Sequence, residues 1–188
     1  MSEEEALVTL AEYLKQAPKA EEKQRMGWHL EKYRFSQQFI NKHSIVADIG
    51  CGLGFGSKLL ADKSRMVYAF DINPELIGYL KEKYGSISNI EWNVFNVETD
   101  ELSEEQFDLV CLYEVLEHLH NPLDSLRKIR KSLKKGAFLL LSVPNSALID
   151  SKGSNRYHQT GFNLDSLNKL LRIIFSDIRY YSQGYISW

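Results

Sequence analysis

The sequence has few cysteines, few prolines and no long hydrophobic run. Its 188 residues include 2 Cys and 4 Pro, and Cys51 and Cys111 lie far apart with no Cys-x-x-Cys spacing. This pattern excludes a disulfide framework and a zinc knuckle. The longest apolar run, residues 137–141, is far shorter than the roughly 20 residues of a membrane span. The length and composition therefore predict a single domain with a sizeable core.

A surplus of charge of either sign is also lacking. Lys and Arg total 23 and Asp and Glu total 25, which gives a formal net charge of −2. Binding to a polyanion normally needs a basic surplus, so nucleic acid is disfavoured as a partner. The first ten residues, MSEEEALVTL, are acidic where a signal peptide is basic and then apolar. We therefore expect a cytoplasmic protein with no membrane association.

The pattern along the chain predicts an α/β fold. Residues 1–43 show helical spacing of apolar residues, with a break at Pro18. After Ser44, short apolar runs alternate with amphipathic segments. The predicted strands are 45–49, 66–70, 90–95, 109–112, 137–143 and 178–181, and the predicted helices are 55–63, 74–84, 122–133 and 163–175. Such alternation is typical of a mostly parallel sheet with helices on both faces, a three-layer sandwich.

A glycine-rich turn follows the first predicted strand. Residues 48–56 read DIGCGLGFG, with Gly at every second position from Gly50. Glycines let a backbone turn tightly and approach a ligand closely, and the next helix offers its N-terminal N–H groups. The dinucleotide fingerprint Gly-x-Gly-x-x-Gly fails, because Phe55 or Ser57 stands where its third glycine belongs. This spacing disfavours a nicotinamide cofactor.

Two further strand ends complete a predicted nucleotide site. Asp71 ends the second strand, 21 residues after Gly50, where a carboxylate can accept hydrogen bonds from both ribose hydroxyls. The alternative is that Asp71 binds no ribose and only caps the start of the next helix. Asn96 and Val97 follow the third strand, where a side chain and a backbone N–H can contact an adenine edge. The long irregular segment 144–161 is either a substrate lid or a plain surface loop.

Five segments in order make the chain resemble class I S-adenosylmethionine-dependent methyltransferases over about residues 25–182. They are DIGCGLG (48–54), FDI (70–72), FDLV (107–110), EVLEHL (114–119) and LLLSVPN (139–145). The resemblance implies a Rossmann-like sheet in the order 3-2-1-4-5-7-6, with S-adenosylmethionine across its carboxyl end. The cofactor contacts that it implies are Asp48, Gly50, Cys51, Gly52, Gly54, Asp71, Ile72, Asn96, Val97 and Tyr113.

The chain departs from the family pattern at three places. Asn96 stands where many relatives have Asp, although its amide oxygen can still accept from the adenine amino group. Residues 134–137 (KKGA) replace a Pro-Gly-Gly turn, so we expect an altered loop. The sequence ends at Trp188, so we expect the last strand of the sheet to be missing or short.

The chemical step is expected near the ends of strands four and five. His118 titrates close to neutrality, and we assign it as the general base, although it can equally cap a helix or pack beside the cofactor. If the segment is helical, Glu114, Glu117 and His118 share one face and form a divalent-metal half-site that His158 can complete. We favour no metal. This Glu-x-x-Glu-His pattern resembles metal-assisted methyltransferases of small-RNA ends and of the ubiquinone pathway.

Two segments resemble a subgroup associated with sugar and polysaccharide pathways, namely 24–35 and 155–158. In that subgroup the leading helix lies over the cofactor, so we predict a helical cap at 1–43 and a cofactor-binding domain at 44–188. Tyr33, Glu114 and His158 are then candidates for acceptor binding. The alternative for Tyr33 is simple burial in the core.

The sequence thus predicts an enzyme that moves a methyl group to an oxygen or nitrogen of a small molecule, which is a sugar in one interpretation. Three alternatives stay open. They are a non-catalytic cofactor-binding scaffold, a metal-assisted O-methyltransferase of RNA ends or quinone precursors, and a nicotinamide-dependent oxidoreductase. The sequence does not distinguish a monomer from a homodimer.

Overall fold

In the computed structural model, which describes residues 20–145 and 159–181, five parallel strands form one sheet. The strands are β1 (Ile45–Ile49), β2 (Met66–Asp71), β3 (Ile90–Val94), β4 (Phe107–Tyr113) and β5 (Leu133–Ser142). Their spatial order is β3-β2-β1-β4-β5. The predicted α/β class and the order of the first five strands are therefore confirmed.

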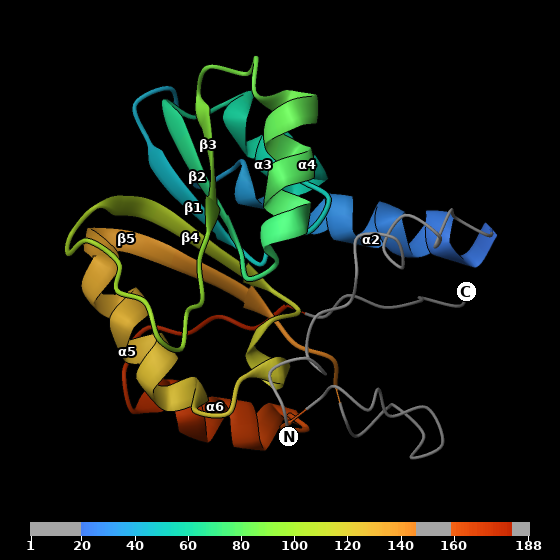
Figure 1. Ribbon diagram of the computed structural model, residues 1–188. Coiled ribbons are helices and arrows are strands. Elements are labelled where there is room, and N and C mark those ends of the chain that lie inside the picture. The colour runs from blue at the N-terminus through green and yellow to red at the C-terminus, as the bar shows by residue number, and fades with distance from the viewer. Residues whose placement is uncertain (1–19, 146–158, 182–188) are drawn as a thin grey trace.

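Helices cover both faces of this sheet (Figure 1). They are α2 (Ala20–Ser36), α3 (Phe55–Ala61), α4 (Pro74–Tyr84), η2 (Leu116–His118, a 3₁₀ turn), α5 (Pro122–Ser132) and α6 (Leu164–Arg172). α3 and α4 lie on one face, where α2 contacts α3, and α5 and α6 lie on the other. No helix in the described part of the chain is both long and apolar enough to cross a membrane.

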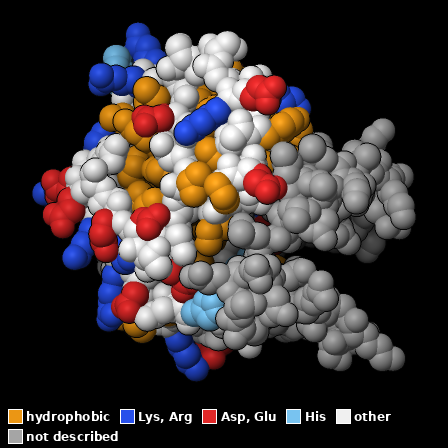
Figure 2. Space-filling view, in the orientation of Figure 1, with side chains coloured by type: hydrophobic (Ala, Val, Ile, Leu, Met, Phe, Trp, Pro, Cys, Tyr) orange, Lys and Arg blue, Asp and Glu red, His pale blue; other side chains and the backbone are white. Residues whose placement is uncertain are grey.

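The strands bury side chains on both faces, as their continuous apolar character predicts. Val46, Val67 and Leu109 belong to the cluster under α3 and α4, whereas Ala47 and Val110 belong to the cluster under α5 and α6. Neighbouring residues of one strand thus point to opposite sides of the sheet. The space-filling view shows hydrophobic side chains at the surface on the upper left of the molecule (Figure 2).

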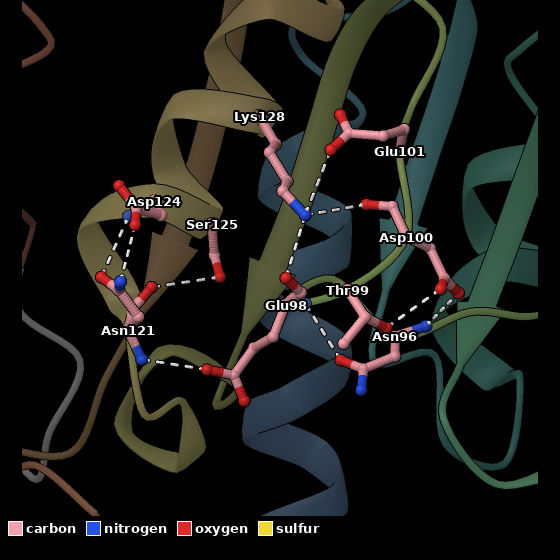
Figure 3. A network of polar contacts seen from close by, with 9 residues as sticks. All are labelled: Asn96, Glu98, Thr99, Asp100, Glu101, Asn121, Asp124, Ser125 and Lys128. Carbon is pink, nitrogen blue, oxygen red and sulfur yellow. Dashed lines mark hydrogen bonds and ion pairs between the residues drawn. The ribbon is translucent and has the colours of Figure 1, made fainter.

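The connection between β3 and β4 contains no helix and is held by side chains instead (Figure 3). Lys128 of α5 donates to the backbone oxygens of Glu98 at 2.9 Å and Asp100 at 3.2 Å. The Glu98 carboxylate accepts from the backbone N–H groups of His120 at 2.8 Å and Asn121 at 2.9 Å. Because these bonds satisfy the backbone, the connection is fixed against α5 without a secondary structure of its own.

Three sequence expectations need correction or restriction. Residues 178–181 are irregular rather than a strand, since no described strand pairs with them. Residues 134–137 lie within β5 rather than in a loop, with Gly136 at φ 79° near a register shift opposite β4. The predicted helical segment 1–43 is helical over Ala20–Ser36, continues as turns, and lies outside the described residues before position 20.

Two helical glycines should respond in opposite ways to the same substitution. A Cβ at Gly56 would lie 2.0 Å from the Tyr33 ring, whereas a Cβ at Gly78 would meet nothing within 4 Å. Gly56→Ala should therefore lower the free energy of unfolding by about 2 kcal/mol through overpacking. Gly78→Ala should raise it by about 0.5–1 kcal/mol through helix propensity. Urea unfolding of both variants measures the difference, and equal effects would contradict this packing of Tyr33.

Candidate functional site

The glycine turn joins β1 to α3 at the carboxyl end of the sheet. Gly50, Gly52 and Gly54 all have positive φ, at 77°, 51° and 75°. The N–H groups of Gly50 and Cys51 both donate to the Phe70 oxygen, at 2.8 and 2.9 Å, which ties the turn to β2. Residues with a Cβ rarely adopt such φ values, so this backbone path explains why the sequence needs glycine here.

The space around the turn differs from glycine to glycine. A Cβ at Gly50 would lie 2.3 Å from Val115 Cγ2, so the loop after β4 packs directly on the start of the turn. A Cβ at Gly52 would meet nothing within 4 Å. The middle of the turn therefore faces open space, as a backbone that approaches a ligand requires.

Asp48 supports the turn from within the core. It is fully buried, and its two carboxylate oxygens accept hydrogen bonds from Tyr33 at 2.9 Å and Ser57 at 2.6 Å. Burial raises the pKa of Asp48 to about 6, although both hydrogen bonds act in the opposite direction. Asp48 thus connects α2, β1 and α3 and fixes the turn above it.

Asp71 is joined to the same turn. Its carboxylate accepts from the N–H groups of Gly52 and Asn73, both at 3.0 Å. Burial raises the pKa of Asp71, and these backbone bonds partly offset the effect. Next to it, Ile72 is 54% exposed, which leaves an apolar surface beside the carboxylate. A ribose on Asp71 with an adenine on Ile72 fits this pair of side chains.

The residues after β3 are placed at the same edge. Val97 is buried, at 5% exposure. The Asn96 side-chain oxygen accepts from the Glu98 N–H at 2.9 Å, and the Asn96 N–H donates to Asp100 at 2.9 Å (Figure 3). The oxygen that the sequence suggested for the adenine amino group is thus already used in a local turn.

The leading helix α2 reaches the ends of β4 and β5, which the sequence did not reveal. Lys32 Nζ lies 2.5 Å from Glu114 Oε1 and donates to Ser142 Oγ at 2.9 Å. Ser142 Oγ donates to the same Glu114 oxygen at 2.6 Å. Burial raises the pKa of Glu114, but the Lys32 charge and these hydrogen bonds outweigh it, so the pKa lies below its usual value. The Glu114 side chain is therefore ionised, and it is partly exposed. Its backbone has a positive φ of 56°.

Two tyrosines pack between α2 and the sheet. Tyr33 and Tyr113 meet edge to face, with ring centroids 5.1 Å apart, and each is 8% exposed. The Tyr113 hydroxyl lies 2.6 Å from Ser36 Oγ. Burial raises the pKa of both tyrosines, so they stay neutral. Tyr33, a candidate for the acceptor entrance, thus lies in the core against Asp48 and Gly56.

The predicted helical face of Glu114, Glu117 and His118 is wrong. Glu114 has left-handed backbone geometry, and only Leu116–His118 forms a 3₁₀ turn, so the three side chains do not follow helical spacing. Among residues 20–145 and 159–181, no three His, Cys, Asp or Glu side chains are grouped to hold a metal ion. His158, the proposed fourth ligand and acceptor contact, lies outside the described residues.

Glu117 is instead a buried carboxylate with few contacts. Its side chain is 2% exposed, and neither oxygen has a hydrogen-bond partner in the described part of the chain. Burial raises its pKa to about 7 and the Glu114 charge adds to the effect, while its own backbone N–H and the Lys32 charge partly offset it. His118 Nε2 lies 3.9 Å from Glu117 Oε1, and the His118 side chain is 38% exposed.

Comparison with known proteins decides which family has this arrangement. Residues 47–141, which run from β1 through β5, match the methyltransferase domain family. This chain belongs to the methyltransferase domain family. The methyltransferase domain therefore includes the glycine turn, Asp71 and the segment after β4.

Its relatives include S-adenosylmethionine-dependent enzymes. A probable S-adenosylmethionine-dependent methyltransferase of Mycobacterium tuberculosis is 26% identical over 129 residues, covering 67% of this chain and 46% of that protein. A ubiquinone biosynthesis O-methyltransferase of Xanthomonas campestris pv. campestris is 36% identical over 104 residues, covering 53% of this chain and 43% of the relative. The chain thus spans less than half the length of these curated relatives.

A solved structure shares the fold of the methyltransferase domain. A putative methyltransferase from Bacillus halodurans superposes with a TM-score of 0.67 at 19% identity, covering 76% of this chain and 67% of that one. S-adenosylmethionine is the cofactor to which the family and these relatives point. The open space at Gly52 and the carboxylate of Asp71 fit such a ligand.

The buried carboxylate of Glu117 should make the methyltransferase domain less stable as the pH rises. A carboxyl group whose folded-state pKa is raised from 4.5 to about 7 favours the folded state below pH 4.5, and this benefit is lost as the pH rises through 7. Glu117→Gln should therefore raise the free energy of unfolding at pH 8 by about 2 kcal/mol and by much less at pH 5. Urea unfolding at both pH values tests this, and a loss of stability at pH 8 would contradict it.

Proposed function

We propose that this protein transfers the methyl group of S-adenosylmethionine to an oxygen or nitrogen of a small molecule. The observation that carries the proposal is the hydrogen bond from the Gly52 N–H to the Asp71 carboxylate. It joins an open glycine turn to the acid that we assign to the ribose, at one edge of the sheet. Ligands of open α/β sheets bind at this carboxyl edge.

We assign the residues at this edge of the sheet to different parts of the cofactor and the acceptor. Bound S-adenosylmethionine supplies a methyl group on a positively charged sulfur. The glycine turn and Asp71 bind and orient the two ends of the cofactor, and Ile72 covers the adenine. Tyr113 would contact the methionine part of the cofactor, and Glu114 would contact the acceptor. Positioning of two reactants in this way accounts for much of the rate of a displacement reaction.

His118 is the group we assign to the acceptor proton. Its imidazole is 38% exposed and follows β4, the side from which we propose that the acceptor approaches. A hydroxyl acceptor loses its proton as the new bond forms, and a neutral imidazole accepts it. The electron pair of the broken carbon–sulfur bond stays on the sulfur. An amine acceptor can release its proton later, so it needs His118 less.

The proposal also includes the chemical class of the methyl acceptor. The 36% identity with a ubiquinone biosynthesis O-methyltransferase favours an oxygen acceptor, as in a quinone precursor. The resemblance to sugar-pathway enzymes rests on residues 155–158, which lie outside the described part of the chain, and on the α2 segment. We therefore place a quinone precursor before a sugar as the acceptor, and we propose a cytoplasmic enzyme without a metal.

Cofactor binding provides the first test of the function. Titration calorimetry with S-adenosylhomocysteine should show micromolar binding, with none for NADH, in the presence of EDTA. Asp71→Asn should weaken binding by at least tenfold, because it removes charge-assisted hydrogen bonds to the ribose. The matched variant Asp62→Asn, at an exposed position after α3, should bind within twofold of the original. Binding of NADH alone would favour an oxidoreductase instead.

The role of His118 has its own test once an acceptor has been found among phenols and other hydroxyl compounds. His118→Ala should lower kcat by at least a hundredfold and leave the affinity for S-adenosylhomocysteine unchanged. His43→Ala, before β1 at the opposite end of that strand, serves as the control and should keep full activity. Turnover that survives in His118→Ala would show that another group accepts the proton.

A further inference from the structure

The buried carboxylate of Glu117 has no hydrogen-bond partner among the described residues, and the His118 ring lies 3.9 Å from it. It is 2% exposed and accepts no hydrogen bond from the described residues, while the neighbouring Glu114 carboxylate accepts two. An unpaired buried carboxylate is costly, because desolvation is not offset by any bond. Groups of this kind are often retained where a ligand completes them.

The charges around Glu117 act on its carboxylate in opposite directions. Glu114 lies close enough to oppose its ionisation, and Lys32 close enough to favour it. The Lys32 ammonium is already bonded to Glu114 and Ser142. The other cationic side chains nearby are imidazoles, with His118 at 3.9 Å from Glu117 and His29 beside Glu114. The ammonium ion of Lys32 therefore lies near two carboxylates and is bonded to only one of them, Glu114.

The location of Glu114 and Glu117 points to the end of the cofactor that carries the methyl group. Val115, between Glu114 and Leu116, packs its methyl group on Gly50 at the start of the glycine turn. Glu117 follows two residues later in the 3₁₀ turn. The carboxylates therefore belong to the loop that borders the turn on the side of β4, away from Asp71 and the ribose end.

We propose that Glu117 is the counter-charge for the sulfonium of the bound methyl donor. The inference rests on the proposed function. The methyl donor and its product S-adenosylhomocysteine differ by one methyl group and the positive charge of the sulfur. A carboxylate at this place therefore binds the donor more tightly than the product. Loss of the charge after transfer then weakens the binding of the product and favours its release.

The experiment compares two ligands on three proteins. Calorimetry at pH 8 without acceptor measures the Kd of S-adenosylmethionine and of S-adenosylhomocysteine for the original protein, Glu117→Gln and Glu104→Gln. Glu117→Gln should weaken the binding of the methyl donor by about tenfold and that of the product by less than twofold. Glu104→Gln removes the same charge from an exposed position and should change neither Kd.

Two additions separate this role from a merely structural one. Glu117→Asp keeps the charge and should restore part of the preference for the methyl donor. Sinefungin, which has an amine in place of the methylsulfonium, should lose affinity in Glu117→Gln as the methyl donor does.

Three outcomes overturn the inference. They are an equal loss for both ligands, no loss for either, and a Glu117→Gln protein that is unfolded while Glu117→Asp is folded but shows no preference. If the original protein binds neither ligand, the proposed function itself fails, and that result differs from all three.

Discussion

The carboxylate of Asp48 is the group on which the candidate site depends. It lies one residue before the end of β1 in the centre of the sheet, is fully buried, and accepts hydrogen bonds from Tyr33 of α2 and Ser57 of α3. A buried carboxylate without such bonds is strongly unfavourable, so the three elements must meet in this one arrangement. The glycine turn lies between β1 and α3 and therefore takes its position from Asp48.

A second level of organisation is the contrast between two carboxylates at the end of β4. Lys32 and Ser142 keep the pKa of Glu114 low, whereas burial raises that of Glu117 to about 7. Neighbouring groups whose pKa values are driven apart in this way are typical of functional sites. The buried charge of Glu117 destabilises the folded protein, and Glu117 lies beside the glycine turn. The proposed role explains both facts, because a site for a charged ligand is less stable when it is empty.

The sequence correctly predicted those helices and strands whose ends are determined by neighbouring residues along the chain. The helix at 74–84 was found with the same bounds, because Asn73 caps its first turn and Pro74 fits its first position. The strand predicted at 178–181 was wrong, since β-propensity says nothing about whether a partner strand is present. The helical face after β4 failed because Glu114 has a left-handed conformation that spacing does not reveal. Lys32, Ser36 and Ser142 were missed because their partners are distant in sequence.

The position of Trp92 in β3 has a spectroscopic consequence. Its indole ring is 3% exposed, and its Cη2 and Cζ3 atoms lie 2.7 and 2.9 Å from where a Cβ of Gly54 would be. The ring thus directly supports the last residue of the glycine turn on the side of α4. Any shift of the turn on ligand binding changes the surroundings of this indole, which gives the protein a built-in fluorescent reporter at the site itself.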